Sequence, residues 1–83
     1  MEKSLYTRNQ KLFLNLLRQV REEAKLRQED VAELLDKPQS FVSKYESGER
    51  RLDVLELREI CIALRMPLAD FIKQLEVRLA RRK

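Results

Sequence analysis

The sequence predicts an all-α fold, a compact domain of five helices, and three observations support this prediction. Hydrophobic residues make up 43% and charged residues 39% of the 83 residues, a composition typical of folded rather than disordered chains. The chain contains one Gly and two Pro, so few residues interrupt helices. Its apolar residues recur at helical spacing between short breaks. A chain of this length is expected to fold as one small domain.

Turn and cap residues place the five helices along the chain. The first three are predicted at residues 8–24, 28–35 and 39–47. Thr7 is expected to cap the first helix, and Gly48 to end the third in the left-handed conformation, which Gly adopts without a Cβ penalty. Asp53 is expected to cap the fourth helix with Glu56 as its capping-box partner, and Pro67 is expected to open the fifth.

Helical periodicity also predicts which residues face the core. They are Phe13, Leu16, Leu17, Val20, Ala24, Val31, Ala32, Leu34, Leu35, Val42, Tyr45, Val54, Leu57, Ile60, Cys61, Leu64, Leu68, Phe71, Ile72 and Leu75. Leu12 and Leu14 fall outside the stripe of the first helix. Together with Leu75 and Leu79, they either form a dimer surface or pack the fifth helix against the first, and the pattern leaves both open.

Charge and residue types limit the classes of function. The net charge of +4 permits an acidic partner such as nucleic acid. The chain has no His, which excludes His-based metal sites and catalytic triads, and it has no glycine-rich phosphate loop. Its single cysteine, Cys61, cannot form an internal disulfide, and no apolar run approaches the length of a membrane span. We therefore expect a cytoplasmic protein without catalytic residues, metal or cofactor.

The segment QSFVSKYESGERR, residues 39–51, carries the main indication of function. Two short helices joined by a tight break, the second with a polar outer face, are typical of a helix-turn-helix. The outer side chains are Gln39, Ser40, Ser43, Lys44 and Ser47. Gln39 can pair with adenine through two hydrogen bonds, the Ser residues are short enough for close approach, and Lys44 can reach guanine or phosphate. Residues 26–52 have a net charge of −1, so contacts here depend on where the charges lie.

Several motifs occur in order along residues 26–72. They are Leu26-x-Gln28-Glu29, Ala32, the Gln39-Ser40-x-Val42-Ser43 run, Glu46-x-Gly48 and the helix from Leu55 to Leu64. In this combination the chain resembles the Cro/repressor-type helix-turn-helix family, also called the XRE family. The resemblance implies a repressor-like five-helix DNA-binding domain whose helix-turn-helix is formed by the second and third helices. The chain departs from the family pattern at Lys25 and Asp36, where Gly is frequent, and at Pro38, where Ser or Thr is frequent.

The resemblance also implies roles for individual residues. Base contacts would come from Gln39, Ser40, Ser43 and Lys44. Phosphate contacts would come from Arg27, Gln28, Ser47, Gly48, Arg50 and Arg51. Arg21 and Glu46 would form a structural ion pair between the first helix and the recognition helix. The protein would be a transcriptional regulator that binds two half-sites of double-stranded DNA as a homodimer. Its expected role is that of a repressor, and as a DNA-binding protein it would be associated with the nucleoid.

The chain is expected to divide into an N-terminal arm at residues 1–6, a helix-turn-helix domain at 7–74, and the end of the last helix with a basic tail at 75–83. The homodimer would form through Leu75, Leu79 and the first helix. An antitoxin-like or other protein-interaction module is the alternative function, because the same fold can cover a protein partner. Phe41 either covers the seam between the second and third helices, which we favour, or meets a thymine methyl group.

Overall fold

Residues 2–81, which the computed structural model describes, form five helices and confirm the all-α prediction. The helices are α1 (Glu2–Glu23), α2 (Gln28–Leu35), α3 (Gln39–Ser47), α4 (Val54–Ala63) and α5 (Leu68–Arg81). Side chains are described for residues 7–81, so Arg82 and Lys83 of the predicted basic tail lie outside the described residues. No helix in this part of the chain is long and apolar enough to cross a membrane.

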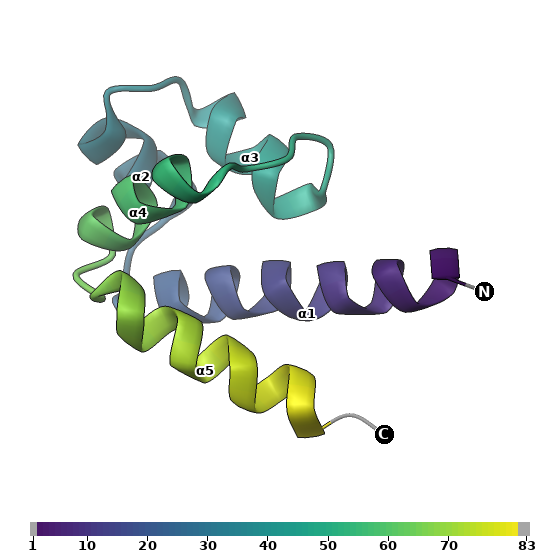
Figure 1. Cartoon of the computed structure of the whole chain (residues 1–83). Coiled ribbons are helices and arrows are strands. Elements are labelled where there is room, and N and C mark those ends of the chain that lie inside the picture. The colour runs from purple at the N-terminus through teal and green to yellow at the C-terminus, as the bar shows by residue number, and fades with distance from the viewer. Residues whose placement is uncertain (1, 82–83) are drawn as a thin grey trace.

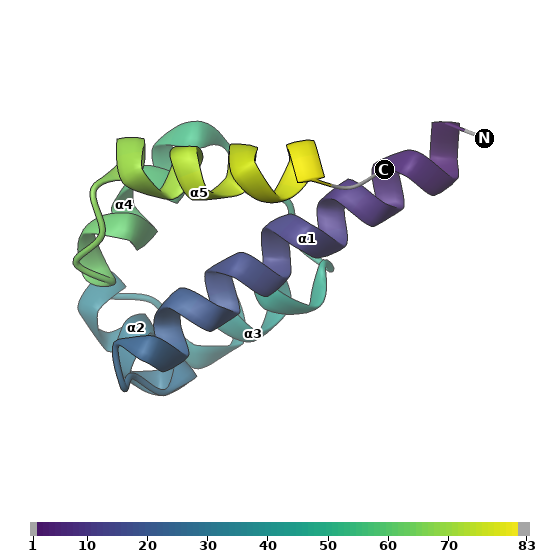
Figure 2. The same cartoon turned by 90° about the horizontal axis from the view of Figure 1, so that it is seen from below.

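The long helix α1 has helices packed on two of its sides (Figure 1). Helix α3 packs on one side of it and α5 on another, while α2 contacts both α3 and α4 and α4 contacts α5. The N-terminal turns of α1 extend beyond the other helices in both views (Figures 1 and 2). This arrangement holds the short pair α2–α3 on one face, supported from behind by α1 and α4.

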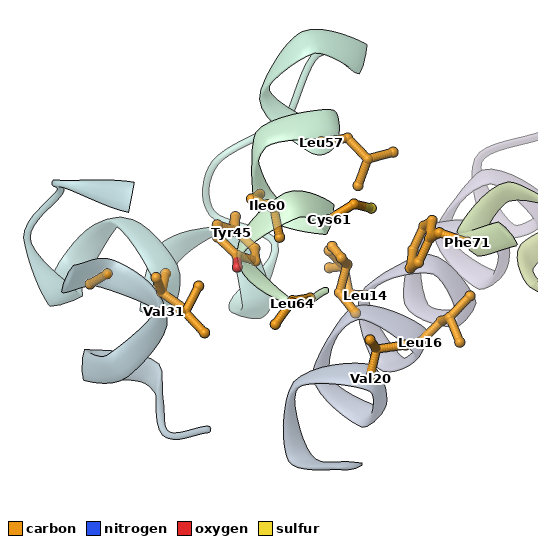
Figure 3. Packing of buried hydrophobic residues seen from close by; sticks show 13 residues of the cluster. Leu14, Leu16, Val20, Val31, Tyr45, Leu57, Ile60, Cys61, Leu64 and Phe71 are labelled. Carbon is orange, nitrogen blue, oxygen red and sulfur yellow. The ribbon is translucent and has the colours of Figure 1, made fainter. Parts of the chain in front are cut away.

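The core receives side chains from all five helices, as Figure 3 shows. Its largest fully buried members are Tyr45, Phe71, Leu16, Leu17, Ile60, Val31, Val42 and Cys61, all of them predicted core residues. Cys61 is buried as a small apolar core residue, and this burial raises the pKa of its thiol to about 11. At about 25 cal/mol per Å² of buried apolar surface, this cluster is the main source of stability.

Four predicted core residues are wrong, because Ala24, Leu34, Val54 and Ile72 are exposed. Ala24 follows the last turn of α1, and Val54 is the first residue of α4, so both lie at helix ends where no neighbour covers them. Leu14, for which the sequence left a dimer surface and packing within the chain both open, is 9% exposed and belongs to the core. Since α3 and α5 pack on different sides of α1, the buried face of α1 is wider than one stripe.

Most predicted helix ends are confirmed. The Asp53 carboxylate accepts from the Glu56 backbone N–H at 2.8 Å, and the Glu56 carboxylate accepts from the Asp53 N–H at 3.0 Å, which completes the capping box of α4. Pro38 and Pro67 directly precede α3 and α5. The start of α1 was wrong: the helix begins at Glu2, so Thr7 lies inside it and residues 2–6 of the predicted arm are helical.

Three helices end with a charged or polar residue in the left-handed region. Lys25, Asp36 and Arg65 have φ of 63°, 58° and 61°. Lys25 and Asp36 stand where Gly is frequent in the family that the sequence resembles, and both residues adopt the left-handed conformation that favours Gly. The left-handed region costs a non-glycine residue about 1–2 kcal/mol. Gly48, at φ 89°, ends α3 without that cost, as predicted.

Candidate nucleic-acid interface

Helix α3 has one buried and one open side. Val42 and Tyr45 are buried in the core, and their burial fixes which way the helix faces. The open side carries the predicted base-contact residues, of which Ser43 is half-buried and Gln39, Ser40 and Lys44 are exposed. This side offers an amide, two hydroxyls and one ammonium group, which are donors and acceptors of the kind that match base edges in the major groove.

The expected ion pair between Arg21 and Glu46 is present and largely removed from solvent. Arg21 donates from Nε to Glu46 Oε2 at 2.7 Å and from Nη2 to Glu46 Oε1 at 3.0 Å. The side chains are only 10% and 6% exposed. Arg21 Nη1 also donates to the Leu26 carbonyl at 3.0 Å, and the bond with Glu46 raises the pKa of Arg21. The pair thus joins α1, the α1–α2 turn and α3.

Two glutamines extend this pair to the start of the recognition helix. Gln28 Nε2 donates to Glu46 Oε1 at 3.0 Å, and Gln39 Nε2 donates to Gln28 Oε1 at 3.0 Å. The contact between Gln28 and Gln39 was not expected from the sequence, because periodicity predicts the face of a side chain and not its partner. One amide proton and the carbonyl oxygen of Gln39 are not used in these bonds, so both stay available toward DNA.

Hydrogen bonds of the Ser47 side chain and of the backbone hold the turn after α3. Ser47 Oγ donates to the Lys44 carbonyl at 3.1 Å and accepts from the Glu49 N–H at 3.4 Å. The Arg50 N–H donates to the same Lys44 carbonyl at 3.2 Å. A Cβ on Gly48 would lie 3.4 Å from Leu14 Cδ1, so the turn passes close to α1. Ser47, Gly48 and Arg51 are all exposed on this turn.

The guanidinium of Arg50, another predicted phosphate contact, is already engaged within the protein. It donates to both carboxylate oxygens of Glu56, at 3.1 and 2.7 Å, and to the Arg51 carbonyl at 2.9 Å. Its Cζ lies 4.8 Å from the centre of the Phe41 ring. The bond with Arg50 is the first cause that lowers the pKa of Glu56 to about 2.

Phe41 packs within the protein, which fits the favoured interpretation. It is half-buried against the core and meets the Tyr45 ring edge to face, with ring centres 5.5 Å apart. Lys37 Nζ lies 5.5 Å from the Phe41 ring centre, so the aromatic ring has a cationic neighbour there as well as at Arg50.

A small hollow opens between α1, α2 and α3. Its lining residues are Arg18, Arg21, Gln28, Ser43, Glu46 and Ser47. The carboxylate of Glu46 is neutralised by Arg21, so the remaining lining groups are two hydroxyls, one amide and one exposed cation. Arg18 was missed from the sequence. It pairs with Glu22 at 3.1 Å, four residues away on the exposed side of α1, and this spacing alone predicts only a solvated ion pair.

Arg27 stands at the start of α2 and is bound to acidic neighbours. Its guanidinium lies 3.2 Å from Glu29 and 3.1 Å from Asp30, with a side chain 71% exposed. The bonds from Arg27 lower the pKa of Asp30. Because the Arg27 side chain is exposed, its ion pairs are weak and can exchange with water or with another anion.

Of the four leucines predicted to form either a dimer surface or a contact within the chain, two belong to the core or pack against it and two are half-buried. Leu14 is buried, with its Cδ1 close to Gly48, and Leu75 packs against the core, so both side chains pack within one chain. The rings of Phe13 and Phe71, 6.0 Å apart, join α1 and α5, and Arg78 donates to Gln19 at 2.9 Å. Leu12 and Leu79 remain half-buried.

Among residues 7–81, no group of three or more His, Cys, Asp or Glu side chains could hold a metal ion. The arrangement that the structure does form is a polar helix face flanked by donors and cations. Such a face suits a polyanion with hydrogen-bonding base edges.

Comparison with known proteins agrees with this geometry. A helix-turn-helix family model matches residues 17–71. The chain is also similar to a solved structure, an XRE-family like protein from Pseudomonas syringae pv. tomato str. DC3000, with 35% sequence identity and a TM-score of 0.85. The match covers 93% of this chain and 94% of that one. A search of the curated proteins finds no match. The chain therefore belongs to the XRE family of DNA-binding helix-turn-helix regulators.

Proposed function

We propose that this protein is a transcriptional repressor that binds a specific double-stranded operator with α3 in the major groove. The proposal rests mainly on the open face of α3, which is polar. Hydrogen bonds that run from Arg21 through Glu46 and Gln28 to Gln39 hold this face at a fixed angle. Repression is the direct consequence of an operator that overlaps a promoter, since the bound domain excludes other proteins. Such a protein acts in the cytoplasm, on the nucleoid.

The base contacts are proposed for Gln39, Ser40, Ser43 and Lys44. Gln39 lies at the first residue of α3, and its free amide proton and carbonyl oxygen match N7 and N6 of adenine. Ser40 and Ser43 have short side chains, which let the helix backbone approach the bases. Lys44, exposed one turn further along, reaches guanine or a phosphate.

The phosphate contacts are proposed for residues that surround α3. They are Arg27 and Gln28 at the start of α2, the Ser47–Gly48 backbone with Arg51 after α3, and in addition Arg18 on α1. Arg18 would exchange Glu22 for a phosphate over the hollow, because an exposed ion pair is worth at most about 1 kcal/mol. These contacts orient α3 but do not read sequence.

A homodimer on two half-sites is proposed to form through the end of α5 and the first turns of α1. The end of α5 and the first turns of α1 lie at the same end of the domain, and these turns of α1 extend beyond the other helices (Figures 1 and 2). Leu79, near the end of α5, and Leu12, near the middle of α1, are only half-buried. Because Leu14 and Leu75 already pack inside the chain, they contribute less to this surface than the sequence alone indicates.

The salt dependence of binding tests this function. Wild-type protein is titrated against a duplex selected from a random pool, from low to physiological salt. The three arginines proposed to contact phosphates predict a slope of log affinity against log salt of about −3 per bound subunit, since each phosphate neutralised by a cation contributes about −0.9. Arg18→Gln should reduce the slope by about 1, and Arg58→Gln, an exposed charge on α4, should not change it. Wild-type binding without any salt slope is incompatible with the proposal.

A further inference from the structure

Arg50 is bound on three sides within the domain. Both carboxylate oxygens of Glu56 accept from it, the Arg51 carbonyl accepts from it, and the Phe41 ring lies beneath its Cζ at 4.8 Å. The Arg50 side chain is 40% exposed and that of Glu56 31%. A planar guanidinium uses both its donor fork and its face in this arrangement, and Lys cannot reproduce it.

The group formed by Phe41, Arg50 and Glu56, here called the Arg50 cluster, joins three successive elements. Phe41 belongs to α3, Arg50 to the following loop, and Glu56 to the first turn of α4. Glu56 also accepts from the Asp53 N–H, so the same carboxylate caps α4 and holds Arg50. The cluster therefore fixes where the chain leaves α3 and where α4 begins.

We propose that Arg50 is a positioning residue for DNA binding, which holds the α3–α4 loop through Glu56 and Phe41 instead of contacting a phosphate. The inference rests on the proposed function, in which this loop presents the Ser47–Gly48 backbone and Arg51 to DNA. If Arg50 turned toward a phosphate, the Glu56 carboxylate would lose its cation and the Phe41 ring its stacked partner. The Glu56 carboxylate, beside the loop that faces DNA, would then keep only the bond from the Asp53 N–H and the longer-range attraction of Lys37.

Three variants distinguish a positioning role from a phosphate contact. Arg50→Lys keeps the charge but removes the fork and the stacking. Glu56→Gln keeps an oxygen for the Asp53 N–H and removes the charge that holds Arg50. Arg51→Gln removes the adjacent charge and is the reference for a phosphate contact. Glu59→Gln, an exposed change of the same charge on α4, controls for the overall field. Affinity for the selected duplex is measured at several salt concentrations, after circular dichroism confirms that each variant is folded.

A positioning role predicts that Arg50→Lys and Glu56→Gln each weaken binding by about three- to tenfold, since the first loses the donor fork and the cation–π contact and the second loses the charge that holds Arg50. Their salt slopes should equal that of the wild type, whereas Arg51→Gln should reduce the slope by about 1. The double variant should bind no more weakly than either single one, because both changes break the same contact.

A phosphate contact predicts the opposite sign for Glu56. Glu56→Gln would then free Arg50 and remove a negative charge, so binding would tighten beyond the effect of Glu59→Gln, and Arg50→Lys would bind as the wild type does. Either result overturns the positioning role. Failure of the wild type to bind the duplex in a salt-dependent way would instead overturn the proposed function, so the two failures can be told apart.

Discussion

The buried pair of Arg21 and Glu46 gives the sharpest prediction for stability. Arg21→Met keeps the length and apolar stem of the side chain but removes the guanidinium. The Glu46 carboxylate, 6% exposed, would then keep only the bond from Gln28, and the Leu26 carbonyl would lose the donor that Arg21 supplies. Breaking one side of a buried ion pair leaves a buried charge without its partner.

The expected loss in the free energy of unfolding is about 3–5 kcal/mol. A domain of this size has a total stability of about 4–12 kcal/mol, at about 0.05–0.15 kcal/mol per residue. The variant should therefore lose a large part of its stability, and its melting temperature should fall by about 15–30 °C. Replacing both residues by apolar ones of similar volume should cost less than the single change, because no buried charge remains.

Urea unfolding followed by circular dichroism at 222 nm measures this loss. Arg18→Met is the matched control, because Arg18 lies on the same helix and forms an ion pair of similar length with Glu22, but with side chains 63% and 54% exposed. The control should lose less than about 0.5 kcal/mol. If Arg21→Met is no more destabilised than the control, burial does not make this pair important and the reasoning is refuted.

The other predictions concern backbone strain and pH, and both are measured by urea unfolding. The three left-handed residues are Lys25, Asp36 and Arg65. Changing each of them to Gly should raise the free energy of unfolding by about 0.5–1 kcal/mol, because the relief of backbone strain exceeds the added entropy of the unfolded chain. Gly48→Ala should lower it by about 1–2 kcal/mol, and equal stability would contradict the strain argument. The pKa of Glu56 is lowered from 4.5 to about 2, so its pair with Arg50 stabilises the fold above pH 4.5 and is lost as the pH falls from there through about 2. Glu56→Gln should remove that part of the acid dependence, and an unchanged acid profile would contradict it.

The fold was predictable wherever local chemistry decides it. Asp53 with Glu56, Pro67 and Gly48 each act on their own turn, and the corresponding helix ends are confirmed. The start of α1 was not, because a single N-cap is worth only about 1 kcal/mol and the preceding residues also support a helix. Arg65 was missed for another reason: Pro67 marks a break after α4 but does not show which residue turns left-handed.

Apart from the Arg21–Glu46 pair, which the family resemblance implied, the candidate site was predictable by face but not by partner. Periodicity placed Gln39, Ser40 and Lys44 on the open side of α3, which the structure confirms as exposed. It could not show that Gln28 bonds Gln39, since this contact depends on how α2 and α3 cross. The engagement of Arg50 with Glu56 depends in the same way on the path of the α3–α4 loop.

Selection of bound duplexes from a random DNA pool, carried out in parallel for the wild type and Gln39→Ala, tests the central claim most directly. The wild type should select two half-sites related by symmetry, spaced for the two recognition helices of a dimer. Gln39→Ala should lose the preference at one base pair in each half-site, a cost of about 1–3 kcal/mol there, and keep it elsewhere. An unchanged motif would show that Gln39 does not read a base, and a wild-type pool without any motif would contradict sequence-specific binding through α3.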